Sequence, residues 1–162
     1  MVKSENFGIV SVKLLNKVIV LSVFLVGCSS IIDSNSAENL WQERFEYCQS
    51  IAVSNKISIP DSKWFDSLVG DDKKTVIGYL ANYTDRKCMS AATEVLRDSL
   101  FVENNQSKID FYSVDLASLD ELAGERIKHL DKKELDHLKN KMSKPFNLRF
   151  ALEEEGLYPK GI

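Results

Sequence analysis

Hydrophobic residues recur every three or four positions along most of the chain after residue 37, which is the spacing that one face of an α-helix requires. The first such stretch covers 38–54 and places Trp41 and Phe45 on one apolar row. Asn35 or Ser36 is the expected N-cap, because short polar side chains accept hydrogen bonds from the free N–H groups of a first turn. We therefore expect the folded domain to begin at Glu38 with an amphipathic helix.

Helical spacing continues through the rest of the chain, with interruptions at Gly, Pro and charged turns. Two capping-box patterns, Ser118-x-x-Glu121 and Asp131-x-x-Glu134, support the helices of the last third. The expected segments are 61–69 capped by Asp61 or Ser62, 71–84 before a turn at 85–87, 90–100, 118–130, 131–142 and a last helix that starts near Pro145 and ends before Gly156. The pattern predicts a mainly α fold, a compact bundle of about six short helices.

One stretch departs from helical spacing. In 109–116, Tyr112, Val114 and Leu116 alternate with their neighbours as they would in a strand. No partner strand is visible, and an isolated strand leaves its backbone polar groups unsatisfied. We interpret 109–116 as an extended segment packed on the helices, after a solvated loop at 103–108. Pairing of its edge with another protein is the functional alternative.

The beginning of the chain has the parts of a secretory signal peptide. An apolar run at 18–24 follows Lys13 and Lys17 and leads into Leu25-Val26-Gly27-Cys28. This last motif resembles the lipobox of bacterial lipoproteins. The resemblance implies that 1–27 is cleaved off, that the Cys28 sulfur receives a diacylglyceryl group, and that the new amino group is acylated, for example with palmitate. The alternative is an uncleaved anchor helix, but the run is shorter than the roughly 20 residues that span a bilayer.

The residues after Cys28 bear on localisation. In lipoproteins of Gram-negative bacteria the residue after the acylated Cys is a sorting signal, and Ser29 is not the Asp that retains a lipoprotein in the inner membrane. The resemblance therefore implies anchoring in the outer membrane, with the domain facing the periplasm. The cell surface is the alternative location. In a Gram-positive bacterium this sorting rule would not apply. Residues 28–37 have the polar composition of a flexible tether, which leaves 38–162 as a single helical domain.

Charge narrows the choice of partners. The whole chain has a formal net charge of −3, and the leader carries Lys3, Lys13 and Lys17 against Glu5, a net of +2. Subtracting the leader from the whole leaves the mature chain near −5. This balance argues against nucleic acid as a partner and assigns the membrane contact to acyl chains on Cys28.

The cysteines supply the clearest chemistry of the mature domain. Once Cys28 is acylated, Cys48 and Cys88 are the only thiols left, and export places them in an oxidising compartment. A disulfide between them would close a loop of about 40 residues and stabilise the fold by about 4 kcal/mol in the chain-entropy model. A redox pair or two buried free thiols are the alternatives, although the spacing is not C-x-x-C.

No motif for catalysis or for a cofactor is present. His129 and His137 are the only histidines, and no H-E-x-x-H or C-x-x-C accompanies them, so a metal site is not expected. The nucleophile elbow, the phosphate-binding P-loop and the dinucleotide-binding glycine pattern are missing as well. We expect a protein that is not an enzyme and that needs no cofactor.

The mature domain is similar in outline to the small helical pilotins that escort secretins. The shared features are the lipobox, a compact helical domain, and a first-helix cysteine, Cys48, bridged to a later one, Cys88. No pilotin motif matches residue by residue, so the resemblance supplies no binding residues. It implies a non-enzymatic binding or assembly factor for an envelope protein machine. The alternatives are an exported cell-wall enzyme or an inhibitor of one, and a surface-exclusion or immunity lipoprotein.

Aromatic residues provide the candidate partner site. Trp41 and Phe45 lie on the first helix, and Trp64 and Phe65 on the second. One inward row of the first helix can bury only some of its aromatic side chains. We predict a groove between the two helices that takes an amphipathic helix or an extended strand of a partner. The alternative is that all these rings close one core over the loop at 57–59.

Overall fold

A computed structural model describes residues 32–159 of the 162-residue chain. The predicted cleavage site, the predicted lipidation site Cys28 and the first part of the predicted tether lie outside the described residues. Every regular element from 32 to 159 is a helix, so the predicted mainly α class is confirmed. None of the described helices is long and apolar enough to cross a bilayer.

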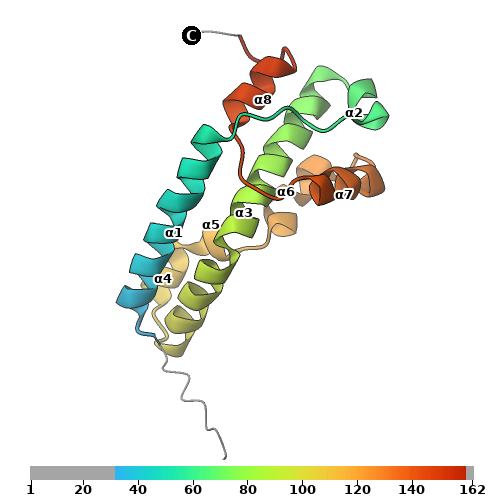
Figure 1. The fold of residues 1–162 in the computed structure, drawn as a ribbon. Helices are drawn as coiled ribbons and strands as arrows, with labels where there is room; N and C mark the ends of the chain where they lie inside the picture. The colour runs from blue at the N-terminus through green and yellow to red at the C-terminus, as the bar shows by residue number, and fades with distance from the viewer. Residues whose placement is uncertain (1–31, 160–162) are drawn as a thin grey trace, which may run out of the picture. The chain divides into compact units, whose positions relative to one another are not determined.

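Eight helices make up the described part of the chain (Figure 1). They are α1 (Ser34–Ser54), α2 (Lys63–Ser67), α3 (Gly70–Val102), α4 (Gln106–Phe111), α5 (Ser113–Leu116), α6 (Leu119–Ile127), α7 (Lys132–Lys141) and α8 (Leu148–Glu154). The long α3 is the central element, because α1, α4, α5, α6, α7 and α8 all contact it. Its most extensive contact is with α1, which lies alongside it.

The central helix α3 corrects the prediction of two separate helices. A turn was expected at 85–87, but α3 continues through it without a break for 33 residues. Charged residues are acceptable in a helix interior, and neither Gly nor Pro occurs between Gly78 and the end of α3. The helical hydrogen bonds therefore continue through 85–87, where the turn was predicted only because three charged residues follow one another.

The start of α1 is also corrected. The helix begins at Ser34 rather than Glu38, and Asp33 is its N-cap, accepting hydrogen bonds from two backbone N–H groups of the first turn at 3.1 Å each. The Ser34 backbone N–H donates to the Glu103 carboxylate at 2.7 Å, and hydrogen bonds from Ser34 hold the pKa of Glu103 below its usual range. A contact with the end of α3 thus orders four residues that had been assigned to the tether.

The segment expected to be extended, 109–116, is helical. It forms the end of α4 and all of α5, and α4 already begins inside the predicted loop at 103–108. Two arginines of α3 hold this region: Arg86 donates to the carbonyls of Val114 and Ala117 at 2.9 and 2.7 Å, and Arg97 donates to the Leu116 carbonyl at 2.8 Å. These carbonyls lie at the C-terminal end of α5, where a helix has no partners of its own for them.

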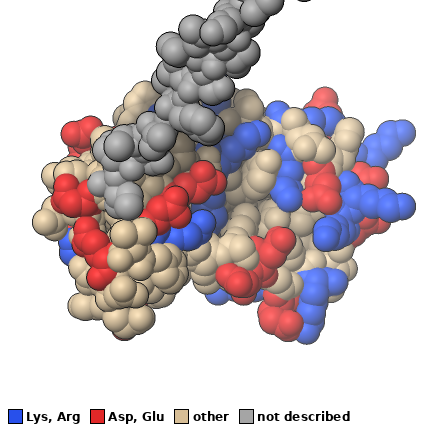
Figure 2. Space-filling model, turned by 90° about the horizontal axis from the view of Figure 1, so that it is seen from below, with Lys and Arg blue, Asp and Glu red and all other residues tan. Residues whose placement is uncertain are grey.

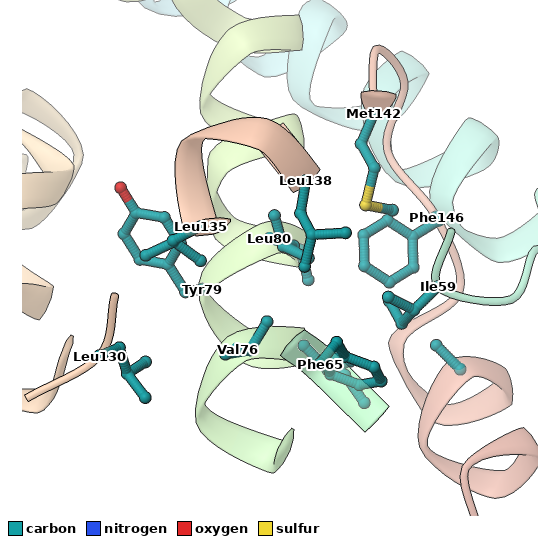
Figure 3. Packing of buried hydrophobic residues seen from close by; sticks show 13 residues of the cluster. Ile59, Phe65, Val76, Tyr79, Leu80, Leu130, Leu135, Leu138, Met142 and Phe146 are labelled. Atoms are coloured by element: carbon teal, nitrogen blue, oxygen red, sulfur yellow. The ribbon is translucent and has the colours of Figure 1, made fainter. Parts of the chain in front are cut away.

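The main hydrophobic core joins α2, the first half of α3 and α7 (Figure 3). Phe65 of α2 is only 2 % exposed, and Leu138 of α7 is fully buried. In Figure 3 both point toward the same space beside α3. The buried members of this cluster are Ile59, Phe65, Val76, Ile77, Tyr79, Leu80, Ala81, Leu130, Leu135, Leu138, Met142, Phe146 and Ala151.

A second, smaller cluster lies between the start of α1 and the end of α3. Ala37, Leu96 and Leu100 are buried in it. The partly buried residues packed against them are Trp41, Val95, Ile109, Tyr112 and Leu116. The described part of the chain therefore has two apolar clusters along α3, and Trp41 of α1 packs against the second.

Several predicted helix ends are confirmed. Ser62 and Asp131 accept hydrogen bonds as N-caps of α2 and α7, and Ser118 forms a complete capping box with Glu121 at the start of α6. Gly156 has a φ of +68°, a left-handed conformation that glycine adopts readily at a helix C-terminus. The last helix begins later than expected, at Leu148, because the preceding connection at 142–147 packs into the core.

Candidate functional site

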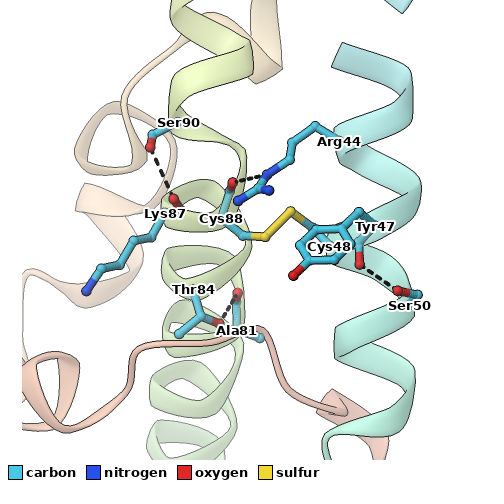
Figure 4. Close-up of a disulfide and its surroundings, with 9 residues drawn as sticks. All are labelled: Arg44, Tyr47, Cys48, Ser50, Ala81, Thr84, Lys87, Cys88 and Ser90. Atoms are coloured by element: carbon cyan, nitrogen blue, oxygen red, sulfur yellow. Dashed lines mark hydrogen bonds between the residues drawn. A yellow bond between two sulfur atoms is a disulfide. The ribbon is translucent and has the colours of Figure 1, made fainter. Parts of the chain in front are cut away.

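The predicted disulfide between Cys48 and Cys88 is present (Figure 4). It joins the middle of α1 to the middle of α3, with the two Cα atoms 6.1 Å apart. Arg44 strengthens the same junction by donating from Nε to the Cys88 carbonyl at 2.8 Å. The bridge therefore fixes how α1 lies on α3, and with it the position of the aromatic residues on α1.

The four aromatic residues predicted to form a partner groove do not come together. Phe65 is buried in the main core and Trp64 packs against it, whereas Trp41 packs against the second cluster. The predicted groove between the first helix and the Trp64–Phe65 segment is therefore wrong, and so is the alternative of one shared aromatic core. Phe65 has too little exposed surface to contact a partner.

Trp41 and Phe45 instead belong to a different group of rings, which we call the aromatic row. The Phe45 and Trp41 rings are stacked with centroids 5.5 Å apart, and Tyr112 meets the Trp41 ring edge-on at 5.3 Å. Phe111 meets Tyr112 edge-on at 4.9 Å. The row thus runs from α1 to the junction of α4 and α5.

Much of this row faces solvent. Phe111 is 78 % exposed and Phe45 is 38 % exposed, and the nearby Val114 of α5 is 60 % exposed. Large exposed side chains that adjoin one another are typical of contact surfaces, whereas single ones are ordinary. Phe111 and Val114 were not named as site residues, although pairing of the edge of 109–116 with another protein was the functional alternative for their segment. The signal in the sequence that could have indicated them is the high content of aromatic and aliphatic residues in 109–116.

A cavity of about 220 Å³ adjoins the row; we call it the aromatic cavity. Trp41 and Phe45 form one side of it, Met89 and Asp85 come from α3, and Val114 comes from α5. The remaining residues that line it are Cys48, Gln49, Asn82, Arg86, Thr93 and Asp115. The aromatic cavity thus lies where α1, α3 and α5 meet.

Asp85 is the unusual group of this cavity. Among the described residues its carboxylate has no hydrogen bond and no ion pair, although the residue is partly buried. Burial raises the pKa of the Asp85 carboxyl above its usual range. Trp41, which also lines the cavity, has a buried indole N–H without an acceptor in the described part of the chain. Two residues that line the cavity therefore carry polar groups without a partner among the described residues.

The histidines lie apart from the aromatic row. His129 Nε2 is 2.8 Å from a carboxylate oxygen of Asp72, and this contact ties the end of α6 to the start of α3 on the surface. His137 lies on α7, far from the rings in sequence and outside the lining of the aromatic cavity. No group of three or more His, Cys, Asp or Glu side chains suited to a metal ion occurs between 32 and 159.

Charge does not single out another site on the face that Figure 2 shows. Seen from the end of the bundle where α1 begins, acidic and basic side chains are interspersed, with uncharged surface between them. A larger hollow of about 550 Å³ is lined by residues of α3, α6 and α7, but its Lys139 is already 3.1 Å from Asp136. The aromatic cavity differs from it in having a partly buried carboxylate that is unpaired within 32–159.

Comparisons of the chain with known protein families, with characterised proteins and with solved structures found no match. The geometry of the aromatic row and its cavity is therefore the structural basis for assigning a function.

Proposed function

We propose that this chain is a lipid-anchored lipoprotein of the outer membrane whose helical domain, on the periplasmic side, binds an envelope protein as a non-enzymatic assembly factor. The aromatic row supports the binding role. Interfaces are enriched in aromatic side chains at their energetic centre, and the row offers Phe45, Phe111 and Tyr112 beside a cavity. The lipobox at 25–28 supports the anchor.

The row is held rigidly, which favours recognition. The Cys48–Cys88 bridge fixes the α1 side, and the hydrogen bonds from Arg86 and Arg97 fix the α5 side. A surface that is already ordered loses little side-chain and backbone entropy when a partner binds. The backbone segments that carry the exposed rings are therefore in place before any partner arrives.

The proposed anchor would keep this surface near the membrane. Asp33 caps α1 only five residues after Cys28, and five residues span at most about 18 Å when fully extended. The start of α1 is therefore close to the lipid headgroups in an acylated protein. A partner would be an envelope protein that is itself in or near that membrane.

Site-specific photo-crosslinking in living cells tests this function. A photoreactive phenylalanine analogue at position 114, in the full-length lipoprotein, should give one discrete adduct with an envelope protein. The Phe45→Ser variant should lose that adduct, because Phe45 is the exposed end of the aromatic row on α1 and also lines the aromatic cavity beside Val114.

The matched control is Val53→Ser, which changes an exposed apolar residue of the same helix, 67 % exposed, outside the row. It should keep the adduct, and both variants should keep their cooperative thermal unfolding. A second variant carries the same analogue at position 111. An adduct that survives Phe45→Ser, or no adduct from either position 114 or position 111, would contradict the proposal.

A further inference from the structure

The aromatic cavity has a charge imbalance that indicates what it binds. Three charged side chains line it: the carboxylates of Asp85 and Asp115 and the guanidinium of Arg86. Arg86 is committed to backbone carbonyls of α5 and of Ala117, whereas neither carboxylate has a partner among the described residues. Two carboxylates and one guanidinium give the cavity a net charge of −1. The guanidinium of Arg86 already donates its hydrogen bonds to backbone carbonyls.

An uncharged or anionic guest does not suit such a cavity. A neutral guest without a hydrogen-bond donor would cover Asp85 and leave its carboxylate unpaired, and a neutral donor would leave the carboxylate's charge uncompensated; both are costly in free energy. An anion would be repelled by two carboxylates. A cationic guest would form a charge-assisted hydrogen bond with Asp85, the stronger kind of hydrogen bond in proteins.

The rest of the wall matches the stem of a long basic side chain. Trp41, Phe45 and Met89 provide an apolar and partly aromatic surface, and methylene groups pack on such surfaces while a cationic head reaches a polar group. The volume of about 220 Å³ lies below the roughly 300–1,000 Å³ of small-molecule pockets. The cavity is therefore better matched to one side chain than to a free metabolite.

We propose that the aromatic cavity takes the ammonium or guanidinium group of a lysine or arginine side chain, which the partner protein inserts between α1 and α5 to pair with Asp85. This inference rests on the proposed function, because it gives the chemistry of the partner at the same site. The partner segment would carry one basic residue among apolar ones, with the apolar residues on the aromatic row.

A titration with single-residue probes tests the cavity without knowledge of the partner. The probes are Nα-acetyl-lysine methylamide and its uncharged counterpart, Nα-acetyl-norleucine methylamide, added to the mature lipoprotein in detergent micelles. The readout is the indole N–H NMR signal of Trp41, one of the two tryptophans, assigned with the Trp64→Phe variant. We expect saturable binding of the lysine probe, at least about tenfold tighter than that of the norleucine probe.

The decisive variant is Asp85→Asn, which should reduce binding of the lysine probe to the norleucine level. Asp98→Asn is the matched control, because it makes the same change on the exposed side of the same helix. Equal binding of the two probes, or lysine binding that is unchanged in Asp85→Asn, would overturn the inference. Tighter binding of butylamine than of the lysine probe would overturn the choice of a protein side chain.

The two proposals fail in different experiments. If position 114 crosslinks to an envelope protein in wild type and equally in Asp85→Asn, the proposed function stands and the cationic inference is wrong. If the lysine probe binds through Asp85 but no adduct forms at positions 111 or 114, the chemistry of the cavity stands and the proposed function is wrong.

Discussion

Asp85 shows how a single residue can conflict with the stability of its own fold. It lies partly buried on α3 beside aromatic rings, with no partner among the described residues, and burial raises its carboxyl pKa. Burying a charge without a partner costs free energy, so folding does not explain an aspartate at this position. Residues that break a local rule without structural compensation are frequent at functional sites.

We predict that Asp85→Asn stabilises the domain at pH 7. Because the folded pKa of Asp85 lies above the unfolded one, the fold favours the protonated carboxyl. The resulting penalty is fully present above the folded pKa and disappears as pH falls below the unfolded value of about 3.9. Thermal unfolding should therefore show a higher Tm for the variant than for the wild type at pH 7, and nearly equal Tm values near pH 3. Asp98→Asn should change little at either pH, and a lower Tm for Asp85→Asn at pH 7 would contradict the reasoning.

Phe65 and Phe45 should respond differently to the same change. Phe65→Ala removes a buried ring from the main core and should cost about 3–5 kcal/mol of unfolding free energy. Phe45→Ala removes a half-exposed ring stacked on Trp41 and should cost about 0.5–1.5 kcal/mol. Urea denaturation of both variants measures the difference. Similar losses for the two would mean that Phe45 also belongs to a closed core.

The α4–α5 segment shows how side chains far along the sequence decide the state of an element. Helices of six and four residues are too short to be stable alone in water. They persist here because Tyr112 and Leu116 pack on the second cluster and because α3 arginines bind the carbonyls at the end of α5. These contacts therefore hold the backbone that carries Phe111 and Val114.

We predict that Arg86→Met loosens this segment while α3 stays helical. The change keeps most of the apolar stem but removes the hydrogen bonds to the carbonyls of Val114 and Ala117, worth about 1.5–3 kcal/mol. Hydrogen exchange of the amides in 113–117 should become faster, while amides of α7 stay protected. Lys87→Met is the control, since Lys87 makes no such bonds to α5; equal effects of the two variants would contradict the assignment.

The disulfide acts at the scale of two helices. We predict that the double variant Cys48→Ala, Cys88→Ala loses about 2–4 kcal/mol, because the bridge restricts a loop of about 40 residues in the unfolded chain. Calorimetry or chemical denaturation measures the loss. Thiol labelling of the denatured, unreduced protein checks the premise: neither Cys48 nor Cys88 should react, and labelling of both would show that no bridge forms.

For the whole molecule, the proposed anchor decides where the helical domain works. We predict that Cys28→Ser abolishes acylation and leaves the protein largely outside the outer-membrane fraction, since both processing and anchoring need the Cys28 sulfur. Density-gradient fractionation and mass spectrometry of the N-terminus measure this outcome. Ser30→Ala, which leaves 25–28 intact, should fractionate like the wild type. A Cys28→Ser protein that remains in the outer membrane would refute the lipobox assignment.

The sequence by itself determined the features that depend on local chemistry. The helical class follows from apolar spacing, and the N-caps at Ser62, Ser118 and Asp131 follow from side chains that bond to backbone groups two or three residues away. The pairing of Cys48 with Cys88 required only the assignment of Cys28 to lipidation and the expectation of export. None of these inferences needed to know which helices touch.

Only the tertiary structure decided which helices lie together and which surface is left free. Contact with Glu103 extends α1 to Ser34, and Arg86 supports the helical state of 109–116, although both partners are distant in sequence. The length of α3 separates the aromatic residues of α1 from those of α2. Because α3 is one long helix, α2 packs near its start and Trp41 packs near its end. Periodicity shows that a ring faces inward along its own helix, but the path of the whole chain decides what it meets there.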